Sequence, residues 1–409
     1  MGDVSVTRHG SGLSEVRERE DFVTVPHTHG SDVDASDGRD FDLSGIVGIR
    51  LVDATSADVA KIRRQLGPLQ AKLIREPDIT IRFVDRVVDE PLTYVGVGDA
   101  GFTDDGFFVL RGKGGTLATA LIPFADIGNQ PEIICERTMP AVPHLLTLIN
   151  LTALTKGVLP LHACAFDIDS TGVLVTGWAK SGKTESLLAC MSEGADYVGD
   201  EWVYLTPERE MFGLPEPIRL WAWHLDQLPS LLADRGRGVR TRLSTWRRLA
   251  ALARGVSHLP ASGVARKALP ILERQAYIQV PPADLFGEDR IRLHGTLSAV
   301  VLMMSHSSPD ITVVPAGPKE ISGRMLSSLA DERAAFLAHY RQFRYAFPML
   351  SSPVVEQAQH MEAELLSVLF DEVPATKVSH PYPCDIGALG RAVKSAAFSV
   401  PAVRGGESE

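Results

Sequence analysis

The stretch that decides the fold is Val173-Leu-Val-Thr-Gly177-Trp-Ala-Lys-Ser-Gly182-Lys183-Thr184. Its first four residues form a short apolar run of the kind that makes a strand buried on both faces. The next eight match the pattern G-x-x-x-x-G-K-[ST] of a phosphate-binding loop. From residue frequencies, a chance match in a chain of this length has a probability of roughly one or two per cent. The sequence therefore predicts a strand, a phosphate loop and a helix from Lys183 to Ser192.

The loop supplies the chemistry of a nucleotide site. Gly177 and Gly182 let the backbone approach a ligand where a Cβ would obstruct it, and N–H groups at the helix start bind phosphate oxygens. Lys183 is expected to reach the β and γ phosphates, and the Thr184 hydroxyl to help hold Mg²⁺. The alternative is a glycine-rich turn without a ligand. The expected nucleotide-binding residues are Gly177, Trp178, Ala179, Lys180, Ser181, Gly182, Lys183, Thr184 and Glu185.

Two adjacent carboxylates follow within an apolar stretch. Asp200 and Glu201 come sixteen and seventeen residues after Thr184, between Tyr197-Val198 and Trp202-Val-Tyr-Leu205. Acids inside an apolar strand are costly unless they handle a metal or a proton. One can ligate Mg²⁺, directly or through water, while the other accepts the proton of an attacking hydroxyl. The alternative is an exposed strand end with two solvated acids.

The residue patterns along the chain predict an α/β protein that is divided into several segments. Polar, acidic residues at the start predict disorder. Short β-branched and aromatic runs separated by Gly, Asp and Pro predict a β-rich domain, and helical patterns predominate near the C-terminus. The expected segments are a disordered tail at 1–42, a β-rich N-terminal domain at 43–140, an α/β core at 141–225 and 276–318, a basic helical insertion at 226–275, a C-terminal helical region at 319–395 and a tail at 396–409.

Charge and cysteine content exclude several classes of protein. The net charge of −10 divides into −6 for residues 1–42, +9 for residues 235–274 and −13 for the rest. An acidic body argues against a partner that is nucleic acid or membrane. Four scattered cysteines predict neither a disulfide framework nor a zinc site. Because no secretory signal or membrane-spanning run is visible, we expect a cytoplasmic protein.

Residues 161–201 resemble one known family. Leu161-His-Ala163, Gly172-Val-Leu-Val-Thr-Gly177, Ser181-Gly-Lys-Thr-Glu-Ser186 and Gly194-Ala-Asp-Tyr-Val-Gly-Asp-Glu201 are similar to the catalytic domain of HPr kinase/phosphorylase and its relatives. The likeness extends more loosely to the strand expected at Ser298–Met304. It implies a P-loop kinase core akin to that of phosphoenolpyruvate carboxykinase. It also implies phosphoryl transfer from ATP, or another donor, to a hydroxyl, and assembly into homo-oligomers.

The resemblance implies roles for particular residues. Lys183 binds phosphate, Asp200 acts as the catalytic base, Glu201 is its metal-associated neighbour and His162 lies near the reacting phosphate. Without the resemblance, a lone histidine on an apolar strand is as well explained by a hydrogen-bonded core residue.

The sequence departs from the family pattern at two places. The family usually has Asp-Asp where this chain has Asp200-Glu201, so which of the two is the base stays open. The family's E-I-R-G-x-G segment has no counterpart in this chain. The most similar stretch of sequence is Glu216-Pro-Ile-Arg-Leu-Trp221. The resemblance therefore supports neither the phosphorylase reaction nor HPr as the substrate.

Basic residues beyond the acids are candidate substrate contacts. The insertion at 226–275 contains an amphipathic pattern that predicts a lid helix. Its Arg247 and Arg248 are expected to contact the transferring phosphoryl group or an acidic substrate, and a solvated basic face is the alternative. Arg219, on the strand expected after the acids, is a further candidate for a phosphate or substrate contact; the alternative is a surface ion pair.

These features predict an ATP- and Mg²⁺-dependent kinase that phosphorylates a hydroxyl of a small molecule, peptide or protein. A loose phosphoryl-transfer transition state asks mostly for positioning and charge neutralisation. The alternative from another class is a regulatory or interaction protein that binds ATP, hydrolyses it slowly and moves the insertion.

Overall fold

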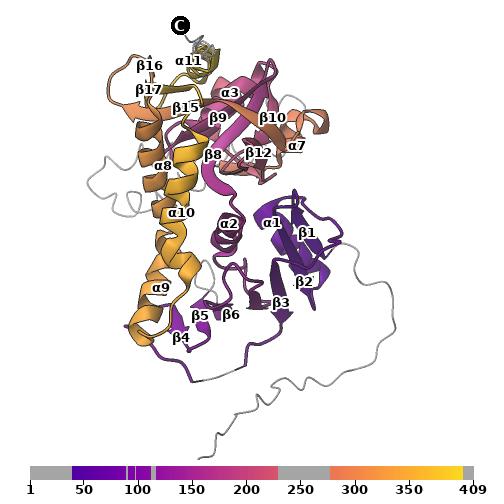
Figure 1. Cartoon of the computed structure of the whole chain (residues 1–409). Coiled ribbons are helices and arrows are strands. Elements are labelled where there is room, and N and C mark those ends of the chain that lie inside the picture. Colours follow the sequence, from indigo (N-terminus) through magenta and orange to yellow (C-terminus); the bar gives the residue numbers. More distant parts are fainter. Residues whose placement is uncertain (1–38, 89–90, 97, 112–116, 229–276, 399–409) are drawn as a thin grey trace, which may run out of the picture. The chain divides into compact units, whose positions relative to one another are not determined.

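Two large sheets and the helices that pack on them form the structure (Figure 1). The computed structural model describes residues 39–88, 91–96, 98–111, 117–228 and 277–398. These residues have a mixed α/β fold, so the expected α/β class is confirmed. Residues 229–275 of the expected insertion, with Arg247 and Arg248, lie outside the described residues.

The N-terminal sheet is mixed and has seven strands in the order β1-β2-β3-β7-β6-β5-β4. Helix α1 (Ser56–Leu66) connects β2 to its parallel neighbour β3, and a capping box formed by Thr55 and Asp58 begins that helix. The strands are β1 (Asp40–Leu43), β2 (Val47–Val52), β3 (Ile79–Val84), β4 (Ala100–Phe102), β5 (Gly106–Arg111), β6 (Leu117–Pro123) and β7 (Glu132–Glu136).

Strand β1 corrects the expected boundary of the N-terminal tail. We expected disorder up to residue 42, but a strand begins at Asp40. Phe41 and Leu43 are buried in the core, and Asp40 pairs with Arg50 on β2. The two acids in this short strand, Asp40 and Asp42, hid its two apolar side chains in a composition-based prediction.

The second sheet contains the strand expected before the phosphate loop. Helix α2 (Leu145–Thr155) leads into β8, and the pairings β8–β9–β15–β12–β11–β8 close a circuit. Each end of the long strand β8 therefore has a different neighbour. The strands are β8 (Leu159–Ile168), β9 (Thr171–Gly177), β10 (Asp196–Gly199), β11 (Trp202–Leu205), β12 (Glu210–Gly213), β15 (His294–His306), β16 (Thr312–Pro315) and β17 (Ala375–Pro381).

A small antiparallel pair adjoins this sheet. Strands β13 (Ile218–Trp221) and β14 (Tyr277–Val280) pair with each other, and the six-residue helix α4 (Ala222–Gln227) follows β13. Helix α7 (Pro282–Phe286) and the 3-10 turn Glu288–Arg290 lead from β14 to β15. Arg219 on this pair is thereby held opposite Gln279.

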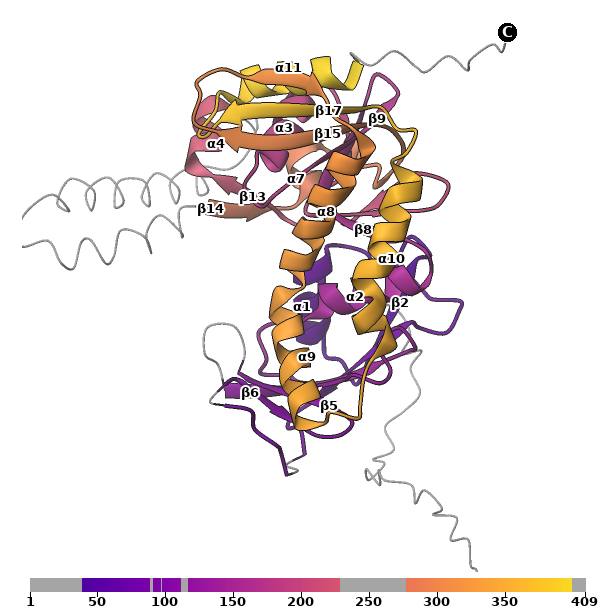
Figure 2. The same ribbon diagram turned by 60° about the vertical axis from the view of Figure 1, so that its left-hand side comes forward.

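The C-terminal region is not wholly helical as we expected. Strand β17 pairs in parallel with β15, and helix α11 (Ile386–Phe398) follows it and packs on α3 (Lys183–Ser192), as Figure 2 shows. Thus β17 belongs to the core sheet, and α11 extends three residues into the expected tail at 396–409. The helices α8 (Pro318–Glu332), α9 (Ala334–Ala346) and α10 (Pro353–Leu369) account for the helical part of the expectation.

One hydrophobic core connects the N-terminal sheet to one side of the second sheet. Phe107 and Phe124 stack with ring centroids 4.7 Å apart, and Phe336 and Phe343 of α9 pack against Phe124. The opposite side of the second sheet packs separately against α3 and α11. The N-terminal sheet is therefore tied to the sheet that carries the phosphate loop.

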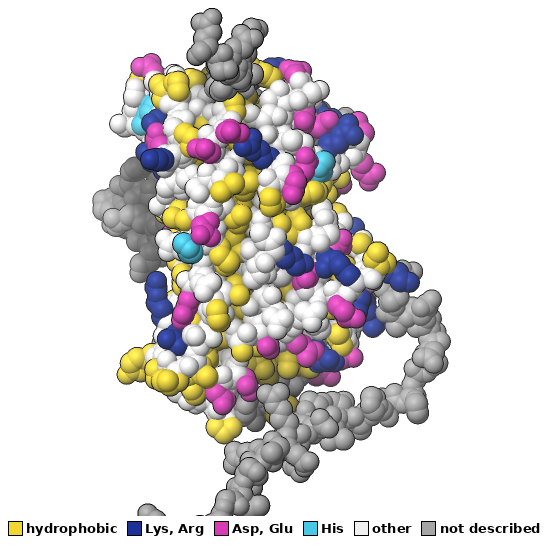
Figure 3. Space-filling view, viewed as in Figure 1, with side chains coloured by type: hydrophobic (Ala, Val, Ile, Leu, Met, Phe, Trp, Pro, Cys, Tyr) yellow, Lys and Arg dark blue, Asp and Glu magenta, His cyan; other side chains and the backbone are white. Residues whose placement is uncertain are grey.

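The exposed surface is mixed in character. On the face shown in Figure 3, acidic and basic side chains are interspersed with apolar ones. None of the described helices has the length and apolar character needed to cross a membrane.

Candidate functional site

The phosphate loop lies between β9 and α3, as the sequence predicts. Gly177 and Gly182 have positive φ values of 152° and 99°. A Cβ on Gly177 would lie 2.6 Å from the carbonyl oxygen of Met303, and one on Gly182 would lie 2.7 Å from Nε2 of His380. Both distances are shorter than real Cβ atoms show, so glycine is required at both positions of the loop.

Lys183 is buried at the start of α3, beneath the loop. Its Nζ donates hydrogen bonds to the carbonyl oxygens of Gly177 and Trp178, each at 3.1 Å. Burial lowers the pKa of Lys183, because the charged ammonium loses hydration. The ammonium thus ties the start of α3 to the backbone of the loop.

Asp200 meets the P-loop hydroxyl, as the spacing of the two motifs suggested. Thr184 Oγ1 donates to Oδ2 of Asp200 at 3.2 Å. The carboxyl is buried, and this burial, together with the neighbouring charge of Glu201, raises the pKa of Asp200 to about 7. A carboxyl with such a pKa can take up and release a proton near neutral pH.

Glu201 turns away from Asp200 and faces His162. Its backbone has φ 65°, in the left-handed region, at the turn between β10 and β11. Its Oε2 lies 3.0 Å from Nε2 of His162, and this hydrogen bond is the main cause of the lowered pKa of Glu201. The two adjacent acids therefore differ: Glu201 is held ionised and Asp200 titrates near neutrality.

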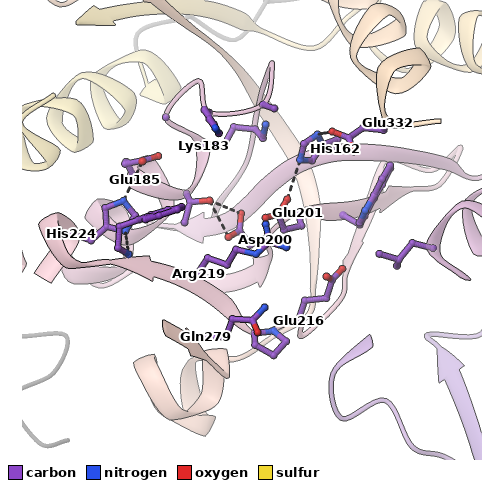
Figure 4. Close-up of a pocket in the computed structure, with 18 of the residues that line it drawn as sticks. His162, Lys183, Glu185, Asp200, Glu201, Glu216, Arg219, His224, Gln279 and Glu332 are labelled. Carbon is purple, nitrogen blue, oxygen red and sulfur yellow. Dashed lines mark hydrogen bonds and ion pairs between the residues drawn. The ribbon is translucent and has the colours of Figure 1, made fainter. Parts of the chain in front are cut away.

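His162 lies between two carboxylates. Its Nδ1 is 2.6 Å from Oε1 of Glu332, the last residue of α8. Burial favours the neutral imidazole, but the hydrogen bond with Glu201 and the ion-pair contact with Glu332 raise the pKa of His162 above its ordinary value. The imidazolium of His162 is therefore a positive charge between Glu201 and Glu332 (Figure 4). Sequence reasoning missed Glu332, because nothing in its helical pattern indicates that the end of α8 reaches β8.

Two further histidines contact the phosphate loop and its helix. Nε2 of His380, on β17, lies 2.7 Å from the carbonyl oxygen of Ser181. Nε2 of His224, on α4, lies 3.2 Å from Oε1 of Glu185. Burial acts to raise the pKa of Glu185, but its contacts with His224 lower it overall. Neither histidine lies near the motif in sequence, so sequence reasoning found neither.

A cavity of about 660 Å³ brings these groups together. Of the expected nucleotide-binding residues, Ala179, Lys180, Gly182, Lys183, Thr184 and Glu185 line it. Gly177, Trp178 and Ser181 do not: Gly177 and Ser181 are buried in the loop, and the side chain of Trp178 is half exposed elsewhere. The catalytic candidates His162, Lys183, Asp200 and Glu201 all line the cavity, as does Arg219.

The cavity also contains residues that the sequence did not point to. Trp221, Trp223 and Tyr382 contribute aromatic surface, and Arg64 reaches it from α1 of the N-terminal sheet. Glu216 and Gln279 line it near Arg219 (Figure 4). These residues come from six segments, so only the folded chain shows that they belong together.

The donor set suits Mg²⁺ bound together with phosphate. Within the described ranges, no group of three His, Cys, Asp or Glu side chains is arranged to hold a metal ion. Mg²⁺ in phosphoryl-transfer sites is typically bound by one or two protein oxygens, and phosphate and water complete its shell. The Thr184 hydroxyl and the Asp200 carboxyl are oxygen donors of this kind, adjacent to the loop.

No model of a known protein family matches the chain, and neither does any curated protein.

Proposed function

We propose that this protein is a kinase with a P-loop core of the HPr kinase type, which transfers the γ-phosphoryl group of ATP to a hydroxyl group. The observation that carries the proposal is the hydrogen bond between Thr184 of the phosphate loop and the buried Asp200. A protein that only binds nucleotide as a regulatory switch needs a hydroxyl and an acid to hold Mg²⁺. Such a protein does not need a general base, whereas the pKa of Asp200, raised to about 7, suits that role.

The phosphate loop, Thr184 and Asp200 have separate tasks in this proposal. The loop N–H groups and Lys183 bind the phosphates, and Thr184 would hold Mg²⁺ with Asp200 beside it. When bound, Mg²⁺ neutralises charge on the phosphate oxygens. Asp200 accepts the proton of the acceptor hydroxyl while the acceptor oxygen bonds to the γ phosphorus and the bond from that phosphorus to the bridging oxygen breaks. ADP leaves with that electron pair.

The remaining charges support the transfer. The imidazolium of His162, held by Glu201 and Glu332, supplies positive charge near the reacting groups. Among the described residues, Arg219 has no ion-pair partner within 4 Å and lines the cavity below the two acids (Figure 4). Its guanidinium suits the transferring phosphoryl group, which would otherwise face Asp200 and Glu201.

Incubation of the full-length protein with a host-cell extract and γ-labelled ATP tests the proposal. We expect label on a defined acceptor with the wild-type protein and with Lys72→Ala, which removes an exposed lysine far from the motif. Lys183→Ala should reduce nucleotide affinity and abolish labelling. Free phosphate alone, or intact bound nucleotide, would instead support the regulatory ATP-binding protein.

A further inference from the structure

Glu216 is a half-buried residue without a function in the proposed chemistry. It lies in the segment between β12 and β13 and lines the cavity, where Figure 4 shows it directed toward Glu201. Its Oε1 is buried and has no hydrogen-bond partner among the described residues. A buried carboxyl oxygen without a hydrogen-bond partner is costly, and a ligand in the cavity that pairs with it would remove that cost.

Two cations of the site, Lys183 and His162, already contact other groups. Lys183 donates to carbonyl oxygens of the loop, and His162 lies between Glu201 and Glu332. Arg219 attracts Glu216 electrostatically, but no ion pair within 4 Å joins them. We therefore expect the positively charged partner of Glu216 to be part of a bound molecule.

The surroundings of Glu216 favour a positive ligand. Burial, followed by the charges of Glu201 and Asp200, raises the pKa of Glu216 to about 8, against the opposing effect of Arg219 and His162. At neutral pH the carboxyl thus holds a proton that a cation can replace. The titratable and charged groups that interact with it are Asp200, Glu201, Arg219, His162, Tyr197 and Tyr204.

We propose that the acceptor carries a protonated amine, which binds Glu216 while the acceptor hydroxyl faces Asp200. This inference rests on the proposed kinase function and adds the chemical class of its substrate. An anionic acceptor group placed there would lie near the ionised Glu201, and like-charge repulsion disfavours that arrangement. The acidic acceptor that we expected from sequence depended on the basic insertion, which lies outside the described residues.

Arg64 suits a second group of the same acceptor. It lines the cavity from α1, is exposed, and has no ion-pair partner within 4 Å among the residues described. A carboxylate or an amide oxygen of the acceptor can pair with it at the rim. The acceptor class is therefore a hydroxylated amine, free or within a larger molecule.

Small probes test this inference without knowledge of the acceptor. The full-length protein, saturated with Mg²⁺ and a non-hydrolysable ATP analogue, is titrated with ethanolamine, ethylene glycol and glycolate, and binding is followed by ligand-observed NMR. We expect ethanolamine to bind at least about tenfold more tightly than the neutral and anionic probes. Glu216→Gln should remove that preference, because the amide mimics the protonated carboxyl and has no negative charge to form an ion pair with an ammonium.

Three controls make the result decisive. Glu208→Gln, which neutralises an exposed carboxyl on the β11–β12 turn, should retain the preference for ethanolamine. Glu216→Gln should retain affinity for the ATP analogue, which shows that its site is intact. A titration with Mn²⁺ distinguishes a second metal: a Mn²⁺ site lost in Glu216→Gln, without ethanolamine binding, would overturn the inference.

Equal binding of the three probes, or an ethanolamine preference that survives in Glu216→Gln, would also overturn it. These outcomes are independent of the kinase test. Loss of phosphoryl transfer with intact ethanolamine binding would contradict the proposed function and leave a cation site at Glu216. Phosphoryl transfer without an amine preference would contradict only the acceptor class.

Discussion

At the scale of single residues, the two adjacent acids have opposite environments. Asp200 is buried against Thr184, with its pKa raised to about 7, and the pKa of Glu201 is lowered by His162. Pairs of acids whose environments separate their pKa values are typical of acid–base chemistry. The sequence left open which acid is the base, and these environments favour Asp200, with Glu201 orienting His162.

Glu332→Gln tests the ion pair at His162. The raised pKa of His162 stabilises the fold at low pH, and this contribution is lost as the pH rises through the folded-state value. The lowered pKa of Glu332 adds a contribution that is lost as the pH falls through its folded-state value. We therefore expect Glu332→Gln to cost about 1 kcal/mol of unfolding free energy between these limits.

Denaturant titrations at several pH values measure this cost, and NMR titration of His162 should show a lower pKa in the variant. Glu364→Gln is a suitable control, because the ion pair that Glu364 forms within the described part of the chain is with the exposed His360 on α10. A cost that is the same at all pH values would contradict the account of His162.

At the scale of elements, sequence patterns predicted the strand, loop and helix of the phosphate site but missed β17. The strand has the sequence Ala-Thr-Lys-Val-Ser-His-Pro, in which Thr376, Val378 and His380 are buried. Of these three, only Val378 is strongly apolar. The alternation of buried and exposed side chains therefore produced no alternation in hydropathy. His380 is buried because it contacts Ser181 in the loop, a contact between residues 199 positions apart.

Two glycines in helices should respond to alanine in opposite ways. A Cβ on Gly323, exposed in α8, would meet nothing within 4 Å, whereas one on Gly390 of α11 would lie 2.5 Å from Cβ of Ala189 on α3. Gly323→Ala should raise the free energy of unfolding by about 0.5–1 kcal/mol. Gly390→Ala should lower it by roughly 1–3 kcal/mol.

Because α3 begins in the phosphate loop, Gly390→Ala should also weaken nucleotide binding, while Gly323→Ala leaves it unchanged. Denaturant titration and nucleotide titration measure the two effects. If Gly390→Ala were as stable as the wild-type protein, the described packing of α11 on α3 would be wrong.

At the scale of the whole molecule, the N-terminal sheet contributes to the site. Nothing in residues 43–140 suggested chemistry, yet Arg64 of α1 lines the cavity. The sheet shares its core with the second sheet, and α9 packs its aromatic side chains against it. Local patterns predict which strands exist, but they carry little information about which distant segments meet. Glu216, His224 and Glu332 escaped prediction for the same reason.

The central claim is that Asp200 accepts the proton of the acceptor hydroxyl during phosphoryl transfer. Its most direct test is single-turnover transfer from γ-labelled ATP to the acceptor by wild-type protein, Asp200→Asn and the control Glu208→Gln. We predict that Asp200→Asn binds nucleotide within about threefold of wild type yet transfers label at least ~100-fold more slowly, while Glu208→Gln is unchanged. Transfer by Asp200→Asn at a near wild-type rate would contradict the claim.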